Sequence, residues 1–387
     1  MKVYMDYAAT TPLDSRVLDA MKPYFSKKFG NTMSLYSLGQ EAKQALEDSR
    51  ETVAKFMNAQ PEEIVFTGSA TESDNLALKG IAFANKNKGR HIIVSSIEHD
   101  AVLNTAKWLG KQGFEITYLP VDEHGLIDLE KLKSSMRKDT ILVSIMHANN
   151  EIGTIEPIEE IGRICKEKGV YFHTDAVQSF GKIPIDVEKM NIDLLSISAH
   201  KFYGPKGVGV LYIRKGVKIE PLLHGGGHEF GLRSSTVNVP GIVGLAEAVR
   251  LRKKEMKSEE KKLTKLRDYL IKNVLKIENS HLNGHPIKRL PNNASFWFAF
   301  IEGEALITQL DMYGIEASTG SACSSKSLEP SHVLMAIGLK HEEAHGSMVL
   351  TLGRSTTMGD VEPVKKATYE TVQRLRKLSP LSQEWRK

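Results

Sequence analysis

The chain has 387 residues, 41% hydrophobic and 26% charged, which is the composition of an ordinary globular protein long enough for two domains. Its net charge of +5 is mildly basic, and no Lys/Arg block is interleaved with aromatic residues, so we expect no direct nucleic-acid binding. No apolar run could span a membrane, the N-terminus lacks signal-peptide character, and two cysteines exclude a disulfide framework. We therefore expect a cytoplasmic protein.

Short β-branched runs alternate with helical patterns from Glu62 to about Ile213. The expected strands lack strict alternation of polar and apolar residues, which is typical of parallel strands buried on both faces. They are residues 63–67, 91–96, 114–120, 140–148, 170–176, 194–198 and 208–213, with helices at 71–84, 99–109 and 158–169 among those between them. The pattern predicts a large α/β domain with a mostly parallel, seven-stranded sheet covered by helices.

A charged helical stretch with alternating signs begins near Arg250. Its apolar stripe (Leu263, Leu266 and Leu270) makes it a plausible connector between domains. Beyond it, strand patterns at 294–301 and 347–354 and a helical pattern at 304–314 indicate a smaller α+β domain. We expect a large domain over residues 16–250 and a small domain formed by 1–15 and 251–387.

Side chains of catalytic type follow five of the expected strands. They are Gly68, Ser69, Ala70 and Thr71 after the first strand, Glu98 and His99 after the second, His147, Asn149 and Asn150 after the fourth, Asp175 and Gln178 after the fifth, and Ser198, His200 and Lys201 after the sixth. Ligands of parallel α/β sheets bind beyond the carboxyl ends of the strands. These residues therefore predict one site.

Pyridoxal phosphate suits these residue types. The cofactor needs a lysine for a Schiff base, a carboxylate at its pyridinium nitrogen, and a helix N-terminus with small residues and hydroxyls for its phosphate. Lys201, Asp175 and the segment "GSATES" at 68–73 meet these needs, and the His99 ring could stack on the cofactor. Each residue alone has an ordinary reading as a surface lysine, a turn or a cap, and the coincidence of five strand ends favours the site.

Long motifs in the chain resemble cysteine desulfurases of the NifS/IscS type, within the fold-type I pyridoxal-phosphate enzymes. They are "MDYAATTP" at 5–12, "IVFTGSATESDN" at 64–75, "EHDAVL" at 98–103, "ILVSIMHANNEIGT" at 141–154, "HTDAVQS" at 173–179, "SISAHKFYGPKGVG" at 196–209, "HGGGHEFGLRS" at 224–234, "STGSACSSKSLEPSHVL" at 318–334 and "LTLGRSTT" at 350–357. The resemblance covers nearly the whole chain.

The resemblance implies a role for each matching residue. Lys201 would form the Schiff base and shuttle the substrate Cα proton, His99 would stack on the ring and act as acid–base, and Cys323 would be the nucleophile. The other cofactor-binding residues would be Ala70, Thr71, Asn150, Asp175, Gln178, Ser198, His200 and, from the second copy of a homodimer, Thr236. Asn31 and Arg354 would hold the substrate carboxylate, and no metal is expected.

The resemblance also implies the reaction. L-cysteine would become L-alanine, and its sulfur would form a persulfide on Cys323, which lies in a small, polar, Gly-containing segment suited to a mobile loop. The sulfur would pass to an acceptor protein, either an iron–sulfur scaffold or a carrier for tRNA or cofactor thiolation. The small domain would carry this cysteine loop. Cys165, which shares a helical face with Ile158 and Ile161, is expected to be a buried structural cysteine.

Three residues depart from the family motifs near the predicted phosphate and substrate sites. Ser69 replaces a glycine that could adopt positive φ or approach the phosphate closely, Thr32 replaces a proline, and Ser235 replaces a glycine. We expect bound cofactor with weakened affinity.

Other readings of the motifs compete with a desulfurase. "HEEAH" at 341–345 matches a zinc-protease pattern, but Gly346 and a strand pattern follow at once. "HGGGH" at 224–228 resembles an esterase loop, but no G-x-S-x-G occurs. A selenocysteine lyase or another pyridoxal-phosphate C–S lyase uses the same scaffold, and "SACSS" favours the desulfurase. A silent scaffold subunit is a further alternative, against which Lys201, Asp175, His99 and Cys323 together argue.

Overall fold

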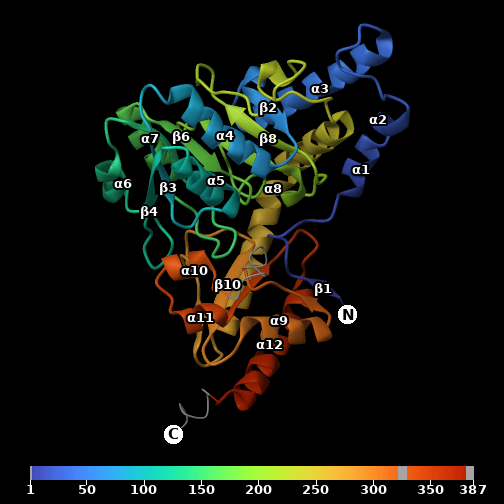
Figure 1. The fold of residues 1–387 in the computed structure, drawn as a ribbon. Coiled ribbons are helices and arrows are strands. Elements are labelled where there is room, and N and C mark those ends of the chain that lie inside the picture. Colours follow the sequence, from blue (N-terminus) through green and yellow to red (C-terminus); the bar gives the residue numbers. More distant parts are fainter. Residues whose placement is uncertain (1, 321–328, 381–387) are drawn as a thin grey trace.

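The computed structural model describes residues 2–320 and 329–380, and a seven-stranded sheet forms the centre of its larger lobe (Figure 1). The strand order is β2-β8-β7-β6-β5-β3-β4. The strands are β2 (Ile64–Thr67), β3 (His91–Ser95), β4 (Glu115–Leu119), β5 (Thr140–Ser144), β6 (Tyr171–Asp175), β7 (Leu194–Ser198) and β8 (Gly209–Ile213). Since β8 pairs antiparallel with both β2 and β7 and all other pairs are parallel, every strand except β8 ends at the same edge.

Helices cover both faces of this sheet, as the apolar strand patterns predict. Leu195 and Ile197 pack into one core with α3 and α7, whereas Leu194 and Leu211 pack into another with α4 and α5. The strands are therefore apolar on both sides. The elements are α1 (Ser15–Met21), α2 (Pro23–Ser26), α3 (Ser37–Phe56), α4 (Ala70–Asn85), α5 (Asp100–Lys111), α6 (Leu129–Ser135) and α7 (Ile158–Lys168), with single turns η1 (Pro61–Glu63), η2 (Ala199–Lys201) and η3 (Glu229–Gly231).

The smaller lobe contains two short sheets and a separate core. An antiparallel sheet has the order β12-β10-β9, and β1 pairs parallel with β11. The strands are β1 (Val3–Tyr4), β9 (Ser280–Leu282), β10 (Asn293–Phe298), β11 (Ile315–Glu316) and β12 (Ser347–Thr351), and the helices are α9 (Gly303–Met312), α10 (His332–Ala336), α11 (His341–His345) and α12 (Met358–Leu378). The first residues of the chain thus join its last third.

A single long helix, α8 (Val239–Val274), connects the lobes (Figure 1). It begins at Val239 rather than near Arg250, because Asn238 caps it and accepts a hydrogen bond from the Gly241 N–H at 3.1 Å. Its first part packs in the large core through Leu245, and the predicted stripe packs in the small core. We propose the domain division 16–250 against 1–15 with 251–387, supported by these separate cores.

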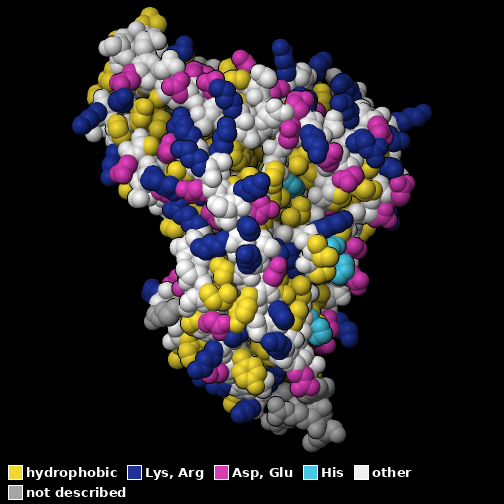
Figure 2. Space-filling model, turned by 180° about the vertical axis from the view of Figure 1, so that it is seen from behind, with side chains coloured by type: hydrophobic (Ala, Val, Ile, Leu, Met, Phe, Trp, Pro, Cys, Tyr) yellow, Lys and Arg dark blue, Asp and Glu magenta, His cyan; other side chains and the backbone are white. Residues whose placement is uncertain are grey.

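The described residues include no helix long and apolar enough to cross a membrane. On the face in Figure 2, basic and acidic side chains are interspersed over both lobes.

Candidate active site

A cavity of about 290 Å³ lies at the sheet edge where the parallel strands end. Nine of the ten predicted cofactor-binding residues line it: Ala70, Thr71, His99, Asn150, Asp175, Gln178, Ser198, His200 and Lys201. They come together because β2, β3, β5, β6 and β7 run in the same direction. The expected convergence of five strand ends is therefore present, while the role of each residue stays a prediction.

The N-terminus of α4 forms one wall of this cavity. Ser69 caps the helix, and its hydroxyl accepts a hydrogen bond from the Glu72 N–H at 3.1 Å. Its φ of −172° is extended backbone open to any residue, so this position does not require the glycine of the family motif. Gly209 of β8 is the demanding position, since a Cβ there would lie 2.7 Å from the Ser69 carbonyl carbon. A phosphate could meet free amide groups at this helix end.

Lys201 reaches the cavity from η2, the single turn after β7. Its Nζ donates hydrogen bonds to the carbonyl oxygens of Ala8 at 2.5 Å and Ala9 at 2.8 Å. His200 is tied to the same N-terminal segment: its Nδ1 lies 3.0 Å from Thr10 Oγ1, and its carbonyl accepts from Thr11 N at 3.0 Å. Burial, with the charges of nearby lysines, lowers the pKa of His200 to about 4, so its ring is neutral at pH 7.

Asp175 and His99 provide the acid and the ring of the predicted site. Asp175 ends β6, and its Oδ1 accepts a hydrogen bond from Val177 N at 2.8 Å. Burial raises the pKa of Asp175, while His99, the Val177 N–H and Lys201 oppose that rise. His99 caps α5, and its Nδ1 accepts from Ala101 N at 3.1 Å, which places the hydrogen of the neutral ring on Nε2. The cap also fixes the orientation of the ring.

Three predicted residues, Asn31, Arg354 and Thr236, are not among those that line the cavity. Asn31 is exposed, and its Oδ1 accepts from Met33 N at 2.9 Å. Arg354 forms an ion pair with Asp14 instead, with its guanidinium 4.4 Å from the centre of the Tyr203 ring. Thr236 is exposed. Cys323 lies outside the described residues, although Ser318 and Gly320, shortly before it, line the cavity.

Sequence reasoning missed several contributors to the cavity, among them the carbonyls of Ala8 and Ala9 and the carboxyl of Asp74. Glu72 is the acidic residue in the first turn of α4, whereas Asp74 lines the cavity. Burial raises the pKa of Asp74, and its Oδ1 has no hydrogen-bond partner among the described residues. Its position one helical turn beyond Thr71 is the signal that could have revealed it.

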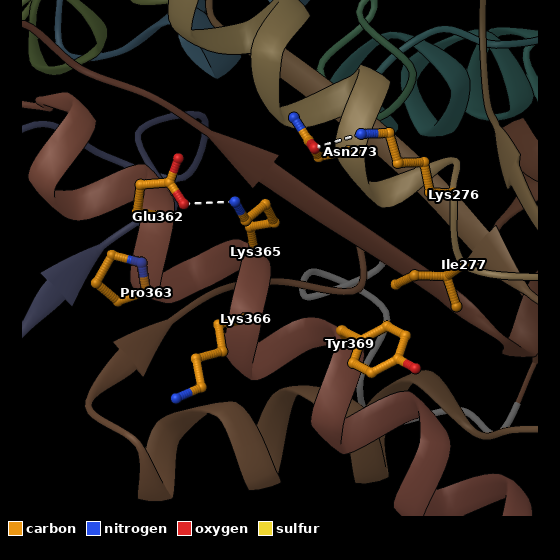
Figure 3. Close-up of a pocket in the computed structure, with 8 residues that line it drawn as sticks. All are labelled: Asn273, Lys276, Ile277, Glu362, Pro363, Lys365, Lys366 and Tyr369. Atoms are coloured by element: carbon orange, nitrogen blue, oxygen red, sulfur yellow. Dashed lines mark hydrogen bonds and ion pairs between the residues drawn. The ribbon is translucent and has the colours of Figure 1, made fainter.

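The alternative sites from the sequence do not form elsewhere. The "HEEAH" segment is the five-residue helix α11, and within the described part of the chain no three His, Cys, Asp or Glu side chains are placed to bind a metal. Cys165 is fully buried in α7, as expected, and burial raises the pKa of its thiol. A separate hollow of about 670 Å³ between α8 and α12 is lined by lysines, Glu362 and Tyr369 and contains none of the predicted site residues (Figure 3).

The cavity fits pyridoxal phosphate by its donor set. It offers a lysine amine, a buried carboxylate, a histidine ring, and a capped helix N-terminus beside Ser198 and His200. Its volume is near the lower end of small-molecule sites, about 300 Å³. The Asp74 carboxyl is a further polar group in the lining, and its Oδ1 lies 3.6 Å from His173 Nε2. Nothing in the lining conflicts with a flat, anionic ring compound.

Comparison with known proteins identifies the family of the chain. Residues 3–364 match the family "Aminotransferase class-V". The chain is 57% identical over 380 residues to "Cysteine desulfurase IscS" of Methanosarcina thermophila, covering 98% of this chain and 94% of that protein. A solved "NIFS-LIKE PROTEIN" superposes with a TM-score of 0.92 at 44% identity, covering 97% of this chain and 100% of the other. The structure "SspA in complex with cysteine" gives 0.81 at 39%, with coverage of 92% and 100%. The chain belongs to the aminotransferase class-V family and, within it, to the pyridoxal-phosphate-dependent cysteine desulfurases of the IscS and NifS type.

Proposed function

We propose that this protein converts L-cysteine to L-alanine and takes the sulfur onto Cys323 as a persulfide. The observation that carries the proposal is the cavity that Lys201 lines together with eight other predicted cofactor-binding residues. The similarity to a cysteine desulfurase over nearly the full length of both chains supports it independently.

Residues of this chain would act around the cofactor as follows. When bound, pyridoxal phosphate supplies an aldehyde that joins to amines and a ring that accepts an electron pair. Lys201 would hold the aldehyde and then move the Cα proton of cysteine. Asp175 would keep the ring nitrogen protonated, and the His99 ring, oriented by its cap, would lie against the cofactor and exchange protons through Nε2.

The sulfur step belongs to Cys323. Its thiolate would attack the sulfur of cysteine, so that an S–S bond forms as the Cβ–S bond breaks, and alanine leaves after taking up protons. The chain that follows the cysteine segment is anchored near the cavity: Ser331 Oγ donates to Glu151 Oε2 at 2.5 Å, and His332 Nε2 lies 3.0 Å from the carbonyl of Glu98. These anchors would keep the thiol within reach of the substrate.

We propose a homodimer as the working form. Large apolar side chains between α1 and α3 are exposed: Phe25, Phe29, Met33, Leu35 and Tyr36. Such a cluster on one surface is typical of a protein interface. Thr236 is exposed and not part of the cavity lining, which is the arrangement expected if it completes the site of a second copy. Light scattering at micromolar concentration should give twice the monomer mass, and a monomer that binds cofactor fully would refute this assembly.

The sulfur acceptor would be an iron–sulfur scaffold or a thiolation carrier for tRNA or a cofactor, and the compartment would be the cytoplasm. A mildly basic surface with interspersed charges suits transient contacts with such proteins (Figure 2). Mixing persulfide-loaded protein with each purified acceptor and following ³⁵S transfer would identify it.

The decisive experiment uses L-cysteine and the Cys323→Ala variant. Wild-type protein should form alanine and a persulfide, and the variant should form neither above the rate seen without enzyme. If the variant makes alanine at the wild-type rate without added thiol, Cys323 is not the nucleophile. A selenocysteine lyase is the second candidate, and alanine formation from selenocysteine that persists in Cys323→Ala would favour it.

A further inference from the structure

Lys182 lies behind the cavity, in the turn that follows β6, and has no part in the reaction proposed above. Its backbone is held by a hydrogen bond from Lys182 N to the Ser179 carbonyl at 3.0 Å. The preceding Gly181 has φ of +72°, and a Cβ there would lie 2.9 Å from Arg252 Cγ. These contacts fix the backbone of the turn and therefore the position of the Lys182 Cα.

The amine of Lys182 contacts Gln178, which lines the cavity. Lys182 Nζ donates to the Gln178 carbonyl at 2.7 Å and to the side-chain Oε1 at 3.4 Å. Gln178 Nε2 donates to the Ala8 carbonyl at 3.0 Å, and the same carbonyl accepts from Lys201 Nζ at 2.5 Å. One continuous hydrogen-bond network joins Lys182 to the predicted catalytic lysine.

This network determines which end of the Gln178 amide faces each neighbour. The two ends of an amide have nearly the same shape, so its hydrogen-bond partners decide its orientation. The Lys182 amine is a donor, so the Gln178 amide oxygen points toward it. The Ala8 carbonyl is an acceptor, so the Gln178 NH₂ group points toward that carbonyl. Both partners favour the same orientation.

The charged groups around Lys182 are Lys201, Arg252, Glu259 and His200. Burial, with the positive charge of Lys201, lowers the pKa of Lys182 to about 7. The amine carries hydrogens in both protonation states, so it can donate to Gln178 throughout this range. Lys182 and Lys201 also line a shared space of only about 10 Å³, which is too small for a substrate.

We propose that Lys182 is a positioning residue, which holds the Gln178 amide so that its NH₂ group can donate a hydrogen bond to the ring oxygen of the bound cofactor. The inference rests on the proposed function, where the contact of Gln178 with that oxygen is a prediction. A donor there stabilises the ionised oxygen and lowers the pH at which the visible absorption of bound cofactor changes.

The test is a pH titration of the visible absorption of the holoenzyme. Lys182→Met removes the amine that holds the Gln178 amide, so the hydrogen bond from Gln178 to the ring oxygen should be lost. The midpoint should then rise by about one pH unit, the tenfold change expected for one hydrogen bond to a charged group. Gln178→Met should raise it similarly, and the double variant should shift it no further than either single variant. Lys206→Met is the matched control: Lys206 also lowers the pKa of His200 by its charge but makes no hydrogen bond to Gln178 among those of the described residues, so its midpoint should stay at the wild-type value.

A wild-type midpoint in Lys182→Met overturns the proposal, and so does a double variant in which the two shifts add. If Lys182→Met loses its cofactor on purification, Lys182→Arg decides instead: this variant keeps a donor, and a shifted midpoint in it refutes the role. The outcome is independent of the sulfur chemistry. Protein that binds cofactor but makes no alanine would sink the proposed function, and its titration would still decide the role of Lys182.

Discussion

Glu156 is a buried carboxyl that the folded protein holds in its protonated form. For this reason the fold should become less stable as the pH rises. Glu156 is 3% exposed, its Oε2 accepts from Ile127 N at 3.2 Å, and its Oε1 has no partner among the described residues. Burial raises its pKa from the ordinary 4.5 to about 8. In this interval the folded protein keeps the proton and the unfolded chain loses it, so stability is full below pH 4.5 and falls until the pH passes 8.

The magnitude follows from that interval. Each pH unit in which only the unfolded chain is ionised costs about 1.4 kcal/mol, so between pH 5 and pH 9 Glu156 should remove about 4 kcal/mol of unfolding free energy. Glu156→Gln keeps an acceptor for Ile127 N and cannot ionise. Urea unfolding of the holoenzyme, followed by circular dichroism at both pH values, should show the variant gaining about 4 kcal/mol relative to wild type.

Glu62→Gln is the control for this measurement, because Glu62 is exposed. Its stability difference from wild type should be the same at both pH values. If Glu156→Gln behaves like Glu62→Gln, then Glu156 ionises normally in the folded protein and the reasoning from burial is wrong.

Three further predictions follow from the site and the core. Lys201→Ala should form no covalent adduct with pyridoxal phosphate after borohydride, whereas wild type should carry one on Lys201, and intact-mass and peptide spectra check both. Asp175→Asn should lower the rate of alanine formation about 100-fold, roughly 3 kcal/mol, and Asp19→Asn on the surface should not; equal rates would remove Asp175 from the site. Glu229→Gln should lower the unfolding free energy by about 3–5 kcal/mol, because Glu229 pairs with the buried Arg50 at 2.8 Å. Glu51→Gln, at an exposed ion pair, should lower it by less than about 1 kcal/mol. Similar losses in the two variants would contradict the role of burial.

The sequence predicted the central sheet and most of the cavity for a physical reason. Strands buried on both faces need unbroken β-branched and apolar residues, and this pattern survives in a single sequence. Once those strands are parallel, the polar residues after them must gather at one edge, which is how His99, Asp175 and Lys201 meet.

The missed features carry no such pattern. The Ala8 and Ala9 carbonyls act through the backbone, which any residue possesses, so side-chain types give no sign of them. The start of α8 was missed because its first turns are buried and apolar and lack the charge pattern of its later part. Arg354 was matched by motif, yet its charge is paired with Asp14, a contact between residues far apart in sequence that no local pattern encodes.

The N-terminal segment contacts both lobes, so a truncation at this end would affect the predicted active site. Residues 3–5 form hydrogen bonds with β11 and β12 in the small lobe. A few positions later, the same segment forms hydrogen bonds with Lys201 and His200 in the large lobe. A relative displacement of the lobes would therefore move the N-terminal segment and, with it, the position of Lys201. Removal of the first dozen residues would therefore delete the Ala8 and Ala9 carbonyls, which accept hydrogen bonds from the Lys201 amine.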